Sequence, residues 1–109
     1  MSNTGILPEV ETKEEKEVKR QPPYNVILLN DDDHTYEYVI QMLKSIFGHS
    51  DQKGFKMAEE VDKQGRAIVF TTHKELAELK RDQIHAFGKD DHVATCKGSM
   101  SAVVEPAEE

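Results

Sequence analysis

A polar turn that directly follows an apolar run constrains the fold more than any other feature of this sequence. Residues 24–29 (YNVILL) are apolar and rich in β-prone side chains, which is typical of a buried strand. The next six residues, 30–35 (NDDDHT), supply turn-forming and helix-capping side chains. Apolar residues then recur at helical spacing until Gly48 ends the pattern; they are Tyr36, Val39, Ile40, Leu43, Ile46 and Phe47.

A second helix and a second strand are expected next. The helix begins near Ser50 or Asp51 and runs to Gln64, where Gly65 supplies a C-terminal stop. Residues 66–71 (RAIVFT) follow as a strand.

The remaining part of the domain predicts one more helix and one more strand. Thr72 and Glu75 have the spacing of a capping box, so a third helix is expected to begin there and to stop at Gly88. Residues 92–97 are expected to form the last strand, which residues 98–104 either extend or leave. The helix is expected to bury Leu76, Ala77, Leu79, Ile84 and Phe87. The predicted order is β-α-α-β-α-β, an α+β domain with a small three-stranded antiparallel sheet and three helices.

The two ends of the chain differ from the middle in composition. Residues 1–22 have mixed charge, two prolines close to Tyr24 and no sustained apolar periodicity, so they are expected to form a flexible arm. Residues 105–109 form an acidic tail. Residues 23–104 are therefore expected to be one folded domain.

Charge and composition argue against several kinds of partner. The net charge of the 109 residues is −7, and Arg20, Arg66 and Arg81 are scattered, so no basic stripe for nucleic acid is expected. No apolar run approaches the roughly 18 residues of a membrane span, and residues 1–10 lack the basic and apolar regions typical of a signal peptide. A cytoplasmic monomer without cofactors or membrane contact is expected, and the single cysteine excludes an internal disulfide.

From Pro22 to about Lys97 the sequence resembles the ClpS family. The residues that carry the resemblance are 22–32 (PPYNVILLNDD), 37–40 (EYVI), 61–67 (VDKQGRA) and 75–80. Members of this family are non-enzymatic adaptors that recognise destabilising N-terminal residues and transfer such clients to ClpA or ClpC unfoldases. The resemblance thus implies clients that begin with Leu, Phe, Tyr or Trp.

The turn after the first strand is the expected site for the client's free amino group. An ammonium group has three donors and a positive charge, so its receptor needs converging acceptors, preferably charged. By resemblance, Asn30 and Asp31 hold the α-amino group and the first peptide unit, and Asp32 supports them. Taken alone, Asn and Asp residues after a strand are ordinary turn and helix-capping residues. This is the interpretation given to Asp33 and His34.

The sequence departs from the family at the site itself. A family histidine that also contacts the amino group is replaced by Asp62, near the end of the second helix. A carboxylate there is unfavourable by about 0.3–1 kcal/mol, which leads to the hypothesis that Asp62 holds the ammonium; a solvated surface carboxylate is the alternative. By resemblance, the client's first side chain enters a pocket formed by Tyr36, Val39, Ala58, Val61 and Ala94. Tyr36 and Ala58 replace methionines found in many members, so client preference stays open.

Two further functions follow from the resemblance alone. Glu75 and Lys80 match positions that dock onto the N-terminal domain of the unfoldase, although charges on a helix face are often merely solvated. The arm matches an extension that engages the unfoldase during delivery.

Three other interpretations remain. A Mg²⁺-binding receiver domain also places acidic residues after a strand, but the strand expected at residues 67–71 ends at Thr71, followed by Thr72, rather than at a phospho-accepting aspartate. A metal enzyme built on the 31–34 cluster is disfavoured because four adjacent residues do not readily converge on one ion, and the other histidines are interpreted as surface residues. A protein-interaction module that has lost N-terminal recognition is the third.

Overall fold

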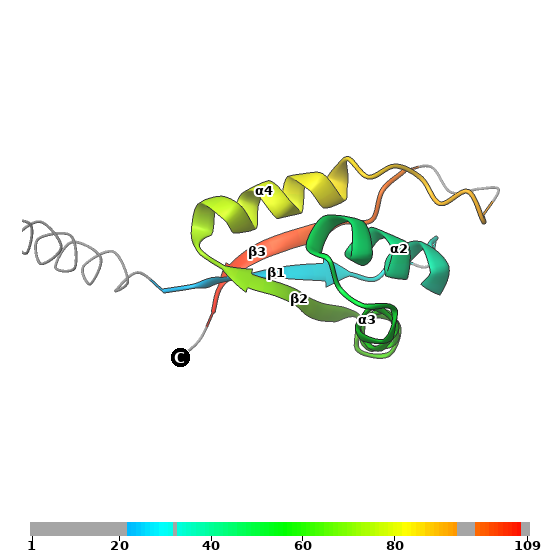
Figure 1. The fold of residues 1–109 in the computed structure, drawn as a ribbon, viewed down its shortest axis with the longest axis horizontal. Helices are drawn as coiled ribbons and strands as arrows, with labels where there is room; N and C mark the ends of the chain where they lie inside the picture. Colours follow the sequence, from blue (N-terminus) through cyan, green and yellow to red (C-terminus); the bar gives the residue numbers. More distant parts are fainter. Residues whose placement is uncertain (1–21, 32, 94–97, 108–109) are drawn as a thin grey trace, which may run out of the picture.

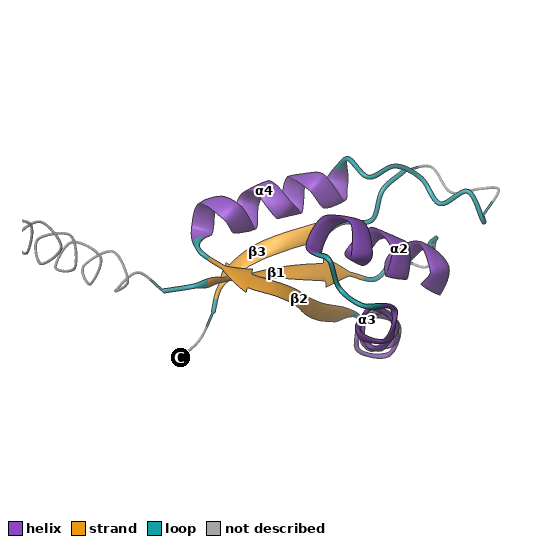
Figure 2. Cartoon of the chain, viewed as in Figure 1, coloured by secondary structure: helices purple, strands orange, loops and turns teal. Residues whose placement is uncertain are grey.

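The computed structural model describes residues 22–31, 33–93 and 98–107. Within these residues it contains three strands and three helices: β1 (Tyr24–Leu29), α2 (Tyr36–Phe47), α3 (Asp51–Gln64), β2 (Arg66–Thr72), α4 (Lys74–His85) and β3 (Ala102–Pro106). The strands form one antiparallel sheet in the order β2-β1-β3. Figures 1 and 2 show α4 along one face of the sheet and α2 and α3 near the end of β1. The predicted α+β class and element order are confirmed.

The central position of β1 explains the apolar run at residues 26–29. Val26 and Leu28 are fully buried and Ile27 is 2% exposed, so both faces of the strand are covered. Leu28 lies opposite Ala67 of β2 and opposite Ala102 of β3. A strand with a neighbour on each edge and buried side chains on both faces favours apolar residues. Its one polar residue, Asn25, lies near the start of the strand and accepts a hydrogen bond from Thr71 Oγ1 at 2.6 Å.

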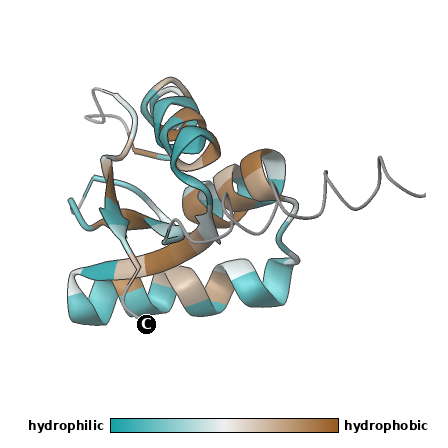
Figure 3. Ribbon diagram, turned by 90° about the vertical axis from the view of Figure 1, so that its left-hand side faces the viewer, coloured by the Kyte–Doolittle hydropathy of each residue, from teal (hydrophilic) through white to brown (hydrophobic). Residues whose placement is uncertain are grey.

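The core lies between the sheet and the helices. Ala77 and Ile84 of α4 are fully buried, and the four buried residues of α2 belong to the same apolar cluster. Figure 3 shows hydrophobic residues along the strands and on parts of the helices that face them. None of the helices in the described part of the chain has the length and apolarity that a membrane span requires.

Capping residues set the ends of α2 and α3 where the sequence predicts them. Thr35 and Ser50 each accept a hydrogen bond from the backbone three residues later, both at 3.1 Å. Gly48 and Gly65 end the two helices at φ 76° and 88°, in the left-handed region that favours glycine.

The prediction for α4 was wrong in detail. The N-cap of α4 is His73, and its side chain makes no capping bond, so Thr72 does not form a capping box with Glu75. Leu79, expected to be buried, is 50% exposed. The helix ends at His85, three residues before Gly88.

The prediction for the last strand was also wrong. His92 and Val93 lie in a turn, residues 94–97 lie outside the described residues, and the strand that pairs with β1 is β3. Because β3 continues to Pro106, it includes the first two residues of the segment expected to be an acidic tail. Ala107 then donates a backbone hydrogen bond to Pro23 O at 2.8 Å.

Candidate binding site

A cavity of about 190 Å³ lies where β1 ends, and it is bordered by α2, α3 and Met100. Its lining residues are Asn30, Asp31, His34, Tyr36, Val39, Ala58, Val61, Asp62 and Met100. All except His34 and Met100 are predicted site residues, so the structure brings these predicted residues together. Asp32 and Ala94, also predicted, lie outside the described residues.

Two backbone hydrogen bonds fix the turn after β1 against distant parts of the chain. Leu29 N donates to Ser101 O at 3.0 Å, and Asn30 N donates to Gly65 O at 3.1 Å. Since Gly65 directly follows α3, the second bond brings the last turn of that helix, with Asp62, to the end of β1.

Asp31 is oriented by its own turn. Its Oδ1 accepts hydrogen bonds from Asp33 N at 3.0 Å and from His34 Nδ1 at 2.8 Å. Its Oδ2 accepts none within the described ranges, so one carboxylate oxygen is fixed and the other remains as an acceptor.

His34 is a component of the site that the sequence did not reveal. Its side chain is only 3% exposed, and Nε2 lies 2.8 Å from Gly98 O while Nδ1 contacts Asp31. Both partner atoms are acceptors; a neutral imidazole donates through one nitrogen and a protonated imidazole through both. His34 therefore connects the turn after β1 to the segment before β3. A single histidine in a polar turn has no local pattern that predicts this contact.

Tyr36 and Asp62 connect α2 to α3 at the cavity. The Tyr36 hydroxyl donates to Asp62 Oδ2 at 2.9 Å. This hydrogen bond is the main reason that the pKa of Tyr36 is raised, and desolvation and the charges of Asp62 and Glu59 raise it further. The Tyr36 ring also packs edge-on against Phe55, with 5.5 Å between ring centroids.

The apolar wall of the cavity is buried. Val39, Ala58, Val61 and Met100 are each between 2% and 5% exposed. The helices that carry the first three come close together at Gly54, where an added Cβ would lie 3.3 Å from the Cα of Ile40. Met100 was missed because it lies two residues before β3, which the sequence misplaced.

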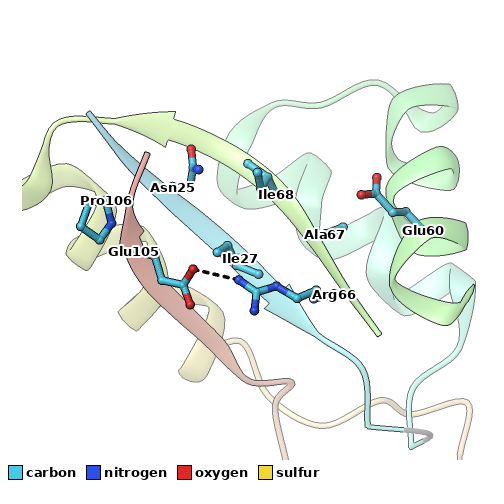
Figure 4. A pocket seen from close by; sticks show the side chains of 8 residues that line it. All are labelled: Asn25, Ile27, Glu60, Arg66, Ala67, Ile68, Glu105 and Pro106. Atoms are coloured by element: carbon cyan, nitrogen blue, oxygen red, sulfur yellow. Dashed lines mark hydrogen bonds and ion pairs between the residues drawn. The ribbon is translucent and has the colours of Figure 1, made fainter. Parts of the chain in front are cut away.

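A second hollow, of about 440 Å³, lies on the sheet face shown in Figure 4. There Arg66 of β2 and Glu105 of β3 form an ion pair of 2.9 Å, with Ile27 of β1 between them in the sheet. None of the predicted site residues lines this hollow.

The structure also bears on the metal-binding alternatives. Among the described residues no group of three or more His, Cys, Asp or Glu side chains is arranged to hold a metal ion. The antiparallel sheet differs from the parallel sheet of a receiver-like domain. His49, expected at the surface, is 9% exposed and donates from Nε2 to Val69 O at 2.7 Å, so that expectation was wrong.

The two predicted unfoldase contacts lie on α4, away from the cavity lining. Glu75 is exposed in the first turn of the helix. Lys80 is half-buried, and its Nζ donates to Ile46 O at 2.7 Å near the end of α2.

The fold and the cavity together define a small α+β binding domain in which oxygen acceptors border an apolar pocket. The family model for the ATP-dependent Clp protease adaptor protein ClpS matches residues 19–95, and the chain belongs to this family. A ClpS protein of Desulforapulum autotrophicum is 32% identical over 83% of this chain and 86% of its own length. One of Roseobacter denitrificans is 36% identical over 80% and 74%. The solved structure of Agrobacterium tumefaciens ClpS2 bound to L-phenylalaninamide is 28% identical, with a TM-score of 0.70 over 81% of this chain and 100% of that one.

Proposed function

We propose that this protein binds the free N-terminus of clients whose first residue is bulky and apolar, and delivers them to an AAA+ Clp unfoldase. The observation that carries the binding step is the composition of one cavity, in which Asn30, Asp31 and Asp62 border buried apolar side chains. A bulky N-terminal residue carries the two groups that complement this lining, an ammonium group and an apolar side chain, on a single carbon atom.

The ammonium group requires several acceptors and benefits from negative charge. Asp31 Oδ2 and Asp62 Oδ1 accept no hydrogen bond within residues 22–31, 33–93 and 98–107, so each is open to a donor. Asn30 is exposed next to them and offers an amide oxygen. Asp32 completes the proposed set through the family resemblance.

The apolar part of the cavity suits a ring or a branched aliphatic group. Val39, Ala58, Val61 and Met100 supply a buried apolar wall, within a cavity of about 190 Å³ that also contains the acceptors. The related ClpS2 was solved with L-phenylalaninamide, which presents a phenyl ring next to a free amine. Burial of a Phe or Leu side chain contributes roughly 1.5–3 kcal/mol.

A panel of peptides that differ only in the first residue tests the binding step. Fluorescence anisotropy is measured with peptides that begin with Phe, Leu, Tyr, Trp, Arg or Gly. We expect the first four to bind and the Arg and Gly peptides to bind at least tenfold more weakly, since tenfold corresponds to about 1.4 kcal/mol. Equal affinity for the Gly and Phe peptides would contradict the proposal, and no binding by a folded protein would favour an interaction module without N-terminal recognition.

Delivery to a ClpA-type or ClpC-type unfoldase is the second step of the proposal. Glu75 is exposed and open to a partner, whereas Lys80 already bonds within the domain. Residues 1–22 are proposed to engage the unfoldase, as the matching extension does in the family.

Removal of the arm separates delivery from binding. Deletion of residues 1–20 should leave the affinity for a Phe peptide unchanged and abolish unfoldase-dependent degradation of a Phe-initiated client. A full-length variant in which residues 1–20 are kept in number and composition but scrambled in order serves as the control for the length of the arm. Loss of peptide binding on deletion would show that the arm belongs to the client site instead.

A further inference from the structure

Tyr36 begins α2 and Asp62 lies in the last turn of α3, yet their side chains meet at the cavity through a 2.9 Å hydrogen bond. The bond occupies Asp62 Oδ2 and leaves Oδ1 without a partner among the described residues. Building on the proposed function, we propose that Tyr36 is a positioning residue whose hydroxyl holds the Asp62 carboxylate in place to receive the client's ammonium group.

Asp62 needs such a partner because of its location. It is exposed, and a carboxylate near the C-terminal end of a helix faces the negative end of the helix dipole. An exposed side chain without a partner samples several rotamers and must be ordered when a ligand binds. Fixing the carboxylate beforehand removes that ordering step and so increases affinity.

Tyr36 is itself held in place, as a positioning residue must be. Its backbone follows the Thr35 cap at the start of α2, and its ring packs edge-on against Phe55 at 5.5 Å. The other carboxylate that acts on the hydroxyl, Glu59, forms an ion pair of 3.1 Å with Lys63. Asp62 therefore remains the acceptor for the hydroxyl.

A double-mutant cycle distinguishes this positioning role from a direct contact between Tyr36 and the client's side chain. Tyr36→Phe removes the hydroxyl and keeps the ring that packs on Phe55, and Asp62→Ala removes the carboxylate. With a free-amine Phe peptide, we expect Asp62→Ala to weaken binding about tenfold. Tyr36→Phe should weaken it roughly three- to fivefold, because the carboxylate remains but loses its fixed orientation. In the Asp62→Ala background, Tyr36→Phe should cause no further loss, since the hydroxyl acts through the carboxylate.

Three results would overturn the proposal: wild-type affinity in Tyr36→Phe, a full additional loss in the double variant, or a changed ratio of Phe-peptide to Leu-peptide affinity. The last result would mean that Tyr36 selects the side chain directly. Melting temperatures of all variants are compared so that the cycle is read only at a temperature where each is folded. Failure of the proposed function is distinguishable, because wild type itself would then bind no free-amine peptide, and the positioning role would be overturned with it.

Discussion

The imidazole Nδ1 of His34 lies 2.8 Å from Oδ1 of Asp31, the carboxylate proposed to hold the client's amino group. The opposite ring nitrogen lies 2.8 Å from Gly98 O, so the ring connects the binding turn to the segment before β3. The orientation of Asp31 therefore depends, through His34, on the backbone of Gly98, which is far away in the sequence.

Replacing His34 should weaken client binding through Asp31. The amide nitrogen of Asn lies near the position of Nδ1, and that of Gln near Nε2. We expect His34→Asn to retain most of the affinity for a Phe peptide and His34→Gln to lose roughly three- to tenfold, since only the first keeps a donor for Asp31. Anisotropy titration of the two variants measures this difference. Equal affinities would show that the His34–Asp31 bond does not contribute to binding.

Asp90 should make the stability of the fold sensitive to acid. It is 1% exposed, and although burial alone raises its pKa, hydrogen bonds from Thr35 and His92 outweigh burial and lower the pKa to about 2. A depressed pKa means that the stabilisation is present above the unfolded value near 3.8 and is lost as pH falls toward 2. The shift corresponds to on the order of 2 kcal/mol.

Chemical denaturation of wild type and Asp90→Asn between pH 7 and pH 2 tests this linkage. The variant should be less stable at pH 7. The difference should shrink below about pH 4, because the Asp90 carboxylate of the unfolded wild type becomes protonated there while that of the folded protein stays ionised until about pH 2. Asp91→Asn, at the exposed neighbouring position, is the matched control and should follow wild type throughout. Wild type and Asp90→Asn curves that stay parallel across the whole range would exclude the linkage.

Gly54→Ala should disturb the contact between the two helices that form the pocket. Alanine favours a helix interior over glycine by about 1 kcal/mol, but the new Cβ would lie 3.3 Å from the backbone Cα of Ile40. Because backbone yields less easily than a side chain, we expect a net destabilisation on the order of 1 kcal/mol and weaker peptide binding. Gln52→Ala, at an exposed position of α3, is the control. A variant at Gly54 with higher stability and unchanged affinity would be the opposite result.

Lys80 and Glu75, predicted together as unfoldase contacts, should behave differently. Lys80 donates to Ile46 O at 2.7 Å and lies 5.7 Å from the Phe47 ring centroid. Lys80→Ala should therefore lower stability by about 1 kcal/mol, or roughly 4–8 °C in melting temperature. Glu75→Lys should leave the melting temperature unchanged and reduce client delivery. If Lys80→Ala has the same melting temperature as wild type, the hydrogen bond to Ile46 O does not contribute to stability.

Sequence patterns predicted β1, α2 and α3 well because local signals define their limits. Each helix cap contacts only the adjacent helical turn, so the spacing of the sequence is enough to predict where α2 and α3 begin and end. The caps are Thr35, Ser50, Gly48 and Gly65. β3 was misplaced because residues 92–97 contain β-prone side chains and only pairing with β1 decides which segment joins the sheet. That pairing is a long-range property that local sequence does not encode.

The same distinction applies to the site. A turn at Asn30 and Asp31 and the apolar positions of α2 and α3 follow from local motifs and helical spacing, whereas their assignment to a binding site came from the resemblance to the ClpS family. The contact between Tyr36 and Asp62 depends on how the start of one helix meets the end of another, which no local pattern fixes. Met100 enters the pocket through the position of β3, so its omission follows from the misplaced strand.

Recognition of a free amino group is tested most directly by one pair of peptides. Fluorescence anisotropy is measured for a Phe-initiated peptide with a free N-terminus and for the same peptide with an acetylated N-terminus, on wild type and on Asp31→Asn. We expect acetylation to abolish measurable binding to wild type, and Asp31→Asn to weaken binding of the free peptide by tenfold or more, since a charge-assisted bond is lost. Equal affinity of wild type for the two peptides would contradict recognition of the N-terminus.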